Sequence, residues 1–202
     1  MGQRNDLVHP VGGKGLKRIG FKPRDIALAL LLRNKQKDME PKEHKVAIEK
    51  LQGYNCFACG TANPIGLNLE FYRLGDKVCA DFIPHKNHEG WENITHGGIV
   101  STLLDEVMSW TVITLKKTLL LTRKMELKYV RPVPVGMPLG VSGRLLDGVS
   151  EPLVKVRGEI RDSEDRLLVK STGEFVMVPA EKLSDVPEGL KEDMAALFNR
   201  LD

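Results

Sequence analysis

The run His96-Gly97-Gly98, followed by Asp105, contains the residue types in this sequence that are best suited to chemistry. Two glycines at the start of a predicted helix leave its first backbone N–H groups uncovered. Such groups attract negative charge because they have no acceptor within the helix. A carboxylate within a buried helix is costly unless it is paired or used. The pattern therefore indicates a site that combines an anion-attracting helix start with a carboxylate.

The elements that must position these residues follow from the hydrophobic pattern. The helix predicted over residues 97–116 is apolar nearly all round, so it should be buried. A strand over residues 66–74 and a return strand over 78–83 flank a hairpin turn at Gly75-Asp76. Four further strands are predicted after the buried helix, over residues 121–131, 138–147, 153–162 and 166–178. This order implies an α+β fold in which an antiparallel sheet wraps around one long helix.

The rest of the chain is predicted to form extensions of this domain. Residues 1–52 are expected to be a basic N-terminal extension that is partly helical, with helices over residues 24–37 and 41–52. Residues 53–180 would form the central domain, and residues 181–202 a tail with a helix over 188–201. The length of 202 residues suits one domain with such additions.

The charge is unevenly spread along the chain. Residues 1–52 hold 12 Lys and Arg against 6 Asp and Glu, whereas the remainder holds 18 against 21. A solvated tail is the favoured interpretation of the basic excess, and binding to nucleic acid or to an anionic surface is the alternative. The apolar run over residues 26–32 is too short to span a bilayer, and no secretory signal pattern opens the chain. We therefore expect a cytoplasmic protein that binds no membrane.

The three cysteines favour a reducing compartment over a disulfide scaffold. Cys56-x-x-Cys59 resembles half of a zinc site, but a structural zinc ion needs four ligands and only Cys79 remains. Loop packing is therefore the favoured role for the pair, and we expect no metal and no cofactor.

Four stretches of the sequence together resemble the PaaI-like acyl-CoA thioesterases, which have the hotdog fold. The resemblance covers about residues 54–178. Its motifs are Cys56-Phe57-x-Cys59-Gly60-x-x-Asn63-Pro64-x-Gly66-Leu67, Glu89-Gly90-Trp91, His96-Gly97-Gly98 with Asp105-Glu106, and Tyr129-x-Arg131-Pro132-Val133-Pro134-x-Gly136.

The resemblance implies hydrolysis of an acyl-coenzyme A thioester. The N–H of Gly97 or Gly98 would polarise the thioester carbonyl, and Asp105 would act as nucleophile or as base for water. Relatives place a Ser or Thr at the position of Thr122 that orients the water or the carboxylate; a plain strand hydroxyl is the alternative. His96 could be a ligand or a base, but it is better suited to hold the helix start by hydrogen bonding.

The spacing agrees with an active site shared between two chains. Asp105 lies eight residues after Gly97, a distance of roughly 12 Å of helix rise. The Asp105 side chain cannot cover that gap to a carbonyl held at the start of its own helix. A second subunit must supply the other half, and the resemblance implies a homodimer or a homotetramer.

The residues that would contact the substrate are less well determined. Relatives often carry Asn or Gln at the position of Gly90, so Asn93, Asn87 or Glu89 would have to substitute. Trp91 could line an acyl pocket or pack in a core. Glu106 is a secondary candidate, and Arg131 could meet the coenzyme A phosphates or be a surface charge.

Two other functions remain open at this stage. Some hotdog domains carry N-terminal DNA-binding helices, so a non-catalytic acyl-CoA sensor with a basic nucleic-acid-binding segment is the first alternative. Residues 1–52 show no clear helix-turn-helix pattern, which makes nucleic acid an unlikely partner. An acyl-thioester dehydratase is the weaker alternative, because the His and Glu arrangement of such enzymes is not apparent.

Overall fold

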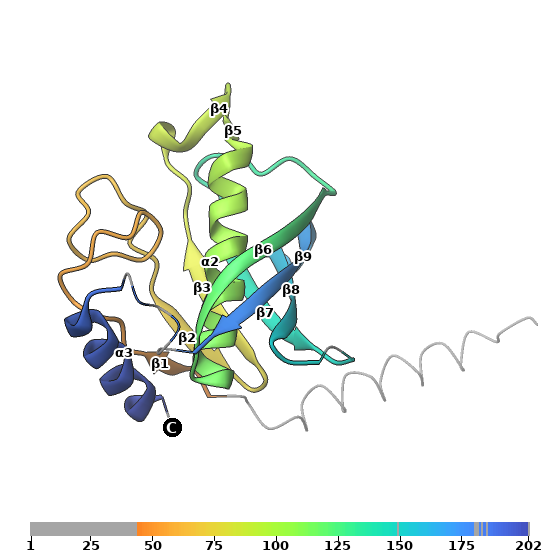
Figure 1. Ribbon diagram of the computed structural model, residues 1–202. Helices are drawn as coiled ribbons and strands as arrows, with labels where there is room; N and C mark the ends of the chain where they lie inside the picture. Colours follow the sequence, from red (N-terminus) through yellow and green to blue (C-terminus); the bar gives the residue numbers. More distant parts are fainter. Residues whose placement is uncertain (1–43, 149, 180–181, 183, 185, 202) are drawn as a thin grey trace, which may run out of the picture. The chain divides into compact units, whose positions relative to one another are not determined.

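A computed structural model describes residues 44–148, 150–179, 182, 184 and 186–201. Within these residues, seven antiparallel strands form one sheet in the order β1-β2-β3-β7-β8-β9-β6. The sheet curves around the long helix α2, Gly97–Lys116 (Figure 1). The strands are β1 (Val46–Ile48), β2 (Phe71–Leu74), β3 (Lys77–Phe82), β6 (Leu119–Tyr129), β7 (Leu139–Leu146), β8 (Leu153–Asp162) and β9 (Leu167–Val178). The predicted α+β architecture is confirmed.

A small hairpin precedes α2 and lies outside the main sheet. It consists of β4 (Glu89–Trp91) and β5 (Ile94–Thr95), and it follows the short 3-10 helix η1 (Lys86–His88). The sequence predicted a strand over residues 66–74, but β2 begins only at Phe71. The residues before it are held differently, because Leu67 and Leu69 donate backbone hydrogen bonds to the carbonyls of Phe57 and Ala58.

The predicted helix over residues 41–52 is wrong in the part that the structure describes. Residues 46–48 form strand β1, which pairs with β2 and buries Ile48 in the core. Two residues later, the buried Lys50 ammonium donates to the Leu69 carbonyl at 2.8 Å and pairs with Glu70 at 2.8 Å. These tertiary contacts outweigh a local helical preference. The sheet thus begins inside the segment 1–52, and the unit that contains it starts at Glu43.

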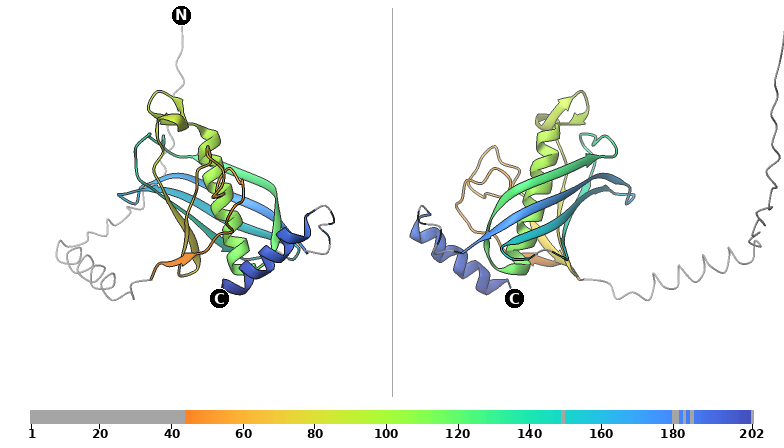
Figure 2. Two further views of the ribbon diagram at one scale, coloured as in Figure 1. Left: turned by 90° about the vertical axis from the view of Figure 1, so that its left-hand side faces the viewer. Right: turned by 45° about the vertical axis from the view of Figure 1, so that its right-hand side comes forward.

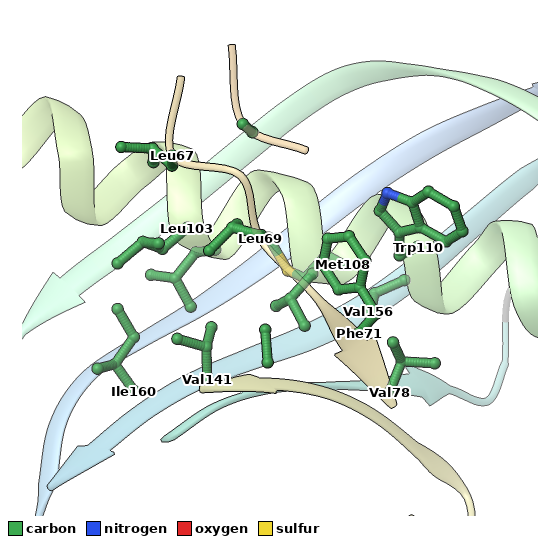
Figure 3. Close-up of a cluster of buried hydrophobic side chains, with 14 of the residues drawn as sticks. Leu67, Leu69, Phe71, Val78, Leu103, Met108, Trp110, Val141, Val156 and Ile160 are labelled. Atoms are coloured by element: carbon green, nitrogen blue, oxygen red, sulfur yellow. The ribbon is translucent and has the colours of Figure 1, made fainter. Parts of the chain in front are cut away.

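Helix α2 fills the centre of the curved sheet, as its sequence predicts. The helix is long and apolar enough to cross a membrane by length and composition alone, but half of that apolar stretch is buried inside the fold. Leu103 and Met108 pack against the sheet, and Trp110 stacks on Phe71 with ring centroids 4.8 Å apart (Figure 3). Core packing therefore explains its hydrophobicity.

Helix α3, Glu188–Arg200, covers the C-terminal end of α2 (Figure 2). Met194 and Leu197 are buried in the same core cluster. The Tyr54 hydroxyl donates to the Asp193 carboxylate at 2.6 Å, which ties α3 to the loop before β2. The helix predicted over residues 188–201 is confirmed, and the helix predicted over residues 24–37 lies outside the described residues.

Glycines on neighbouring strands let α2 approach the sheet closely. Gly143 of β7 pairs with Gly158 of β8. A Cβ at Gly143 would overlap the Thr111 hydroxyl and lie 3.0 Å from the Val107 carbonyl oxygen. The backbone of a buried helix cannot easily retreat from such a contact, so residue 143 must lack a side chain.

Replacing Gly143 by alanine should lower the free energy of unfolding by about 1–3 kcal/mol, because the added methyl group is forced against α2. Gly140→Ala on the same strand is the matched control, because a Cβ there meets nothing within 4 Å. Urea denaturation of both variants measures the difference. Equal stabilities would contradict the close packing of α2 on β7.

Candidate active site

His96 caps the start of α2 and uses one of its free amides. The His96 Nδ1 atom accepts a hydrogen bond from the Gly98 N–H at 2.9 Å. The Gly97 N–H has no acceptor in the part of the chain that the structure describes. Of the two amides that the sequence suggested, Gly97 therefore presents the free donor, and His96 occupies the helix-holding position.

The segment after β6 fixes the position of this helix start. The Thr95 N–H donates to the Val133 carbonyl at 2.8 Å, and the Val135 N–H donates to the Asn93 carbonyl at 3.0 Å. Asn93 itself has a positive φ of 60° in the turn between β4 and β5, a conformation that Asn tolerates better than most residues. The motif from Arg131 to Gly136 thus holds the residues that precede the helix by backbone hydrogen bonds.

Two hydroxyl groups that the sequence analysis did not assign lie at the same place. The Tyr129 hydroxyl donates to the Gly97 carbonyl at 3.0 Å and lies 3.2 Å from the Ser101 hydroxyl. The Ser101 hydroxyl also donates to the Gly97 carbonyl, at 2.9 Å. The alternation of apolar and polar residues along the predicted strand did not indicate that Tyr129 would contact the start of the helix. The only available signal was an aromatic hydroxyl at the end of a strand, just before Arg131-Pro132.

Asp105 and Thr122 form a hydrogen-bonded pair further along the helix. The Thr122 hydroxyl donates to Asp105 Oδ1 at 2.9 Å. Burial raises the pKa of the Asp105 carboxyl, and the hydrogen bond from Thr122 opposes that rise. The pairing between β6 and β9 shifts register between Thr122 and Lys124, and such bulges re-aim side chains. The strand thus presents a hydroxyl to the helix.

Glu106 is held in different surroundings from its neighbour Asp105. Its Oε1 atom accepts a hydrogen bond from the Trp110 indole N–H at 3.1 Å and lies 3.9 Å from Cys56 Sγ. Burial raises the pKa of the Glu106 carboxyl to about 7. The structure therefore places this predicted substrate contact beside the cysteine loop.

The predicted contacts Trp91 and Arg131 lie at the helix start. Both line an open surface cavity of about 420 Å³, together with Gly97 and Tyr129. Trp91 is 84% exposed, so it does not pack in the core of this chain. The Arg131 guanidinium donates to the Leu167 carbonyl at 2.6 Å. The aromatic side chains of Trp91 and Tyr129 thus line the same cavity as Gly97, whose amide is free.

The structure thus brings the predicted residues together in two groups. One group surrounds the start of α2, and the other is the pair Asp105 and Thr122. Asp105 lies eight residues after Gly97, which is roughly 12 Å of helix rise, so the two groups are well separated within a single chain.

Known proteins resemble this chain in sequence over part of its length. Residues 92–169 match the family model of the thioesterase superfamily. Verlamelin biosynthesis protein B of Lecanicillium sp is 29% identical over 142 residues, which cover 56% of this chain and 57% of that protein. The chain therefore matches little more than half the length of this relative.

Solved structures share the fold at low sequence identity. A thioesterase superfamily protein aligns with a TM-score of 0.57 and 21% identity, over 80% of this chain and 81% of its own. A hypothetical thioesterase from Streptococcus pneumoniae TIGR4, crystallised with coenzyme A, gives 0.51 and 20% over 55% and 86%. The E. coli PaaI protein of the phenylacetic acid degradation operon gives 0.51 and 12% over 56% and 81%. Residues 92–169 of this chain are thus similar to the thioesterase superfamily, and the described fold is the hotdog fold that these solved structures share, the PaaI protein among them.

Proposed function

We propose that this protein hydrolyses acyl-coenzyme A thioesters, with each active site built from two copies of the chain. The observation that carries the proposal is the partly buried Asp105 carboxylate, which Thr122 holds at 2.9 Å in the middle of α2. A carboxylate fixed in this way suits attack on an ester-like carbon or activation of water. The free amide at Gly97 supplies the complementary donor for a carbonyl oxygen.

The proposed reaction uses the two half-sites on one substrate. The Gly97 N–H of one chain donates to the thioester oxygen, and the dipole of α2 stabilises negative charge there. Asp105 of the other chain either takes a proton from the attacking water or attacks the carbonyl carbon itself. In both routes the carbon–sulfur bond breaks, coenzyme A leaves as its thiolate, and water ends as part of the free acid. Thr122 holds the carboxylate in its reactive orientation.

The edge of the sheet at strand β6 supports the proposal that a second copy of the chain completes the active site. Strand β6 is the last strand in the sheet order and pairs only with β9 among the described residues. Its side chains are largely exposed, with Leu121 at 62% and Tyr129 at 51% exposure. A long edge strand that is unpaired on one side and exposes Leu121 and Tyr129 is a surface that a partner can cover. A second copy at this edge would cover Leu121 next to the Asp105–Thr122 pair.

The nature of the thioester is supported by a structural relative. The Streptococcus pneumoniae protein that shares this fold was crystallised with coenzyme A. In the present chain, the cavity at the helix start carries Trp91 and Arg131, which suit an aromatic and a phosphate group respectively. We therefore assign coenzyme A to this side of the proposed site.

Asp105→Asn should abolish thioester hydrolysis while the fold is retained. The amide has the same size but cannot act as nucleophile or as base at neutral pH, so we expect a loss of about 100-fold or more in kcat. Release of coenzyme A thiol from a panel of acyl-CoA substrates measures the activity. Asp76→Asn, the same change in the exposed β2–β3 turn, is the control.

Full activity of the Asp105→Asn protein would remove this carboxylate from the mechanism. Tight binding of acyl-CoA by the unmodified protein, without release of thiol from any substrate, would instead favour the acyl-CoA sensor.

Thr122→Val should reduce kcat more than it changes KM, because the carboxylate loses the donor that orients it and not a substrate contact. The hydrogen bond from Thr122 lowers the pKa of Asp105, so its loss should raise that pKa. The acid limb of the pH–rate profile should therefore move to higher pH. Thr122→Ser keeps the hydroxyl and should retain most activity. A Ser variant as impaired as the Val variant would show that the methyl group matters and not the hydroxyl.

A further inference from the structure

The loop before β2 and helix α2 bring three potential metal ligands together. One ligand atom from each of Cys56, Cys59 and Glu106 lies within 4.8 Å of the other two. The distance from Cys56 Sγ to Glu106 Oε1 is 3.9 Å. The cluster shares no residue with the Asp105–Thr122 pair, since Asp105 contacts Thr122 and Glu106 contacts the loop.

The loop is built to hold both thiols on one side of a tight turn. The Gly60 N–H donates to the Cys56 carbonyl at 2.9 Å. A Cβ at Gly60 would lie 2.5 Å from the carbonyl oxygens of Cys56 and Tyr54, so only glycine fits there. The buried ammonium of Lys50 donates to the Cys59 carbonyl at 3.1 Å and secures the end of the turn. The two sulfur atoms are thus held in place before any ligand arrives.

The Glu106 carboxyl group has polar neighbours but no cationic partner among the described residues. Among them, this group forms no ion pair with Lys or Arg, and its hydrogen-bond donors are the Trp110 indole and the thiols of Cys56 and Cys59. The nearby Lys50 is already paired with Glu70. Acidic groups that are gathered and partly desolvated in this way favour a cation.

We propose that Cys56, Cys59 and Glu106 bind one Zn²⁺ ion, with water as the fourth ligand. Zinc bonds of about 2.3 Å to sulfur and 2.0–2.2 Å to oxygen in a tetrahedron place ligand atoms about 3.3–3.8 Å apart. The present separations need only a small contraction to reach these values. A mixed thiolate and carboxylate set suits zinc better than the hard cations Mg²⁺ or Ca²⁺.

The cavity beside the cluster leaves room for the fourth ligand. It has a volume of about 200 Å³ and is lined by all three ligands and by apolar side chains of α2 and α3, including Trp110, Ile113 and Leu197. Cys56 is exposed, which gives the ion a route of entry. The bound ion would fasten the cysteine loop to α2 next to Asp105, so its role is to stabilise this part of the fold.

The test uses the full chain, reduced and freed of metal with a chelator, then titrated with ZnCl2 or CoCl2 alone. We expect one equivalent of zinc to bind and to raise the melting temperature. Cobalt should give a thiolate-to-metal charge-transfer band together with the visible bands of a tetrahedral ion. Because even outer-shell changes commonly weaken metal affinity about 10-fold or more, Cys56→Ser, Cys59→Ser and Glu106→Gln should each lose at least that factor.

Cys79→Ala is the matched control, because Cys79 is a buried cysteine of β3 outside the cluster. It should bind zinc and cobalt as the unmodified chain does. Thermal unfolding of each variant without metal separates loss of a ligand from loss of the fold. The proposal is overturned if the unmodified chain takes up no zinc, if the cobalt spectrum lacks the thiolate band, or if folded Glu106→Gln binds as tightly as the unmodified chain.

Discussion

The burial of one long apolar helix against a curved antiparallel sheet is the constraint on which the rest of this structure depends. Helix α2 supplies much of the core, and Gly143 lets its backbone approach strand β7 closely. Because a packed helix is a rigid rod, its position fixes every group that it carries. The free amide of Gly97 and the Asp105 carboxylate are therefore held a set distance apart. Their separation of roughly 12 Å along the axis is the reason why the proposed active site takes one group from each of two chains.

Consecutive residues of the same helix serve different neighbours. Asp105 and Glu106 point roughly 100° apart around the axis. Asp105 accordingly meets Thr122 of the edge strand β6, and Glu106 meets the loop that carries Cys56. The two carboxylates therefore have different neighbours, and this difference underlies the two roles that we propose for them. Asp105 and Glu106 are both carboxylic acids, so their positions around the helix, and not their residue type, give them these different neighbours.

The features set by local pattern could be predicted from the sequence. The bounds of α2 followed from a largely apolar stretch that begins at two glycines, and the strands after it followed from alternation. Strand β1 could not be predicted, because Val46–Ile48 is a strand only through its pairing with β2 and the anchoring of Lys50. The pairing of Thr122 with Asp105 was suggested by resemblance alone. The contacts of Tyr129 with Gly97 and of Glu106 with Cys56 depend on the tertiary structure. The hydrophobic periodicity of the sequence does not predict such contacts.

Subunit complementation tests the shared active site most directly. Chains carrying Asp105→Asn and chains carrying Gly97→Val, each with a different affinity tag, are co-expressed so that heterodimers can be purified. Each homodimer should be nearly inactive, since the valine blocks access to the free amide and the asparagine removes the base. In the heterodimer one site carries both lesions and the other carries neither, so up to about half of the unmodified activity should return. Confirmed, folded heterodimers without recovered thioester hydrolysis would contradict an active site divided between two chains.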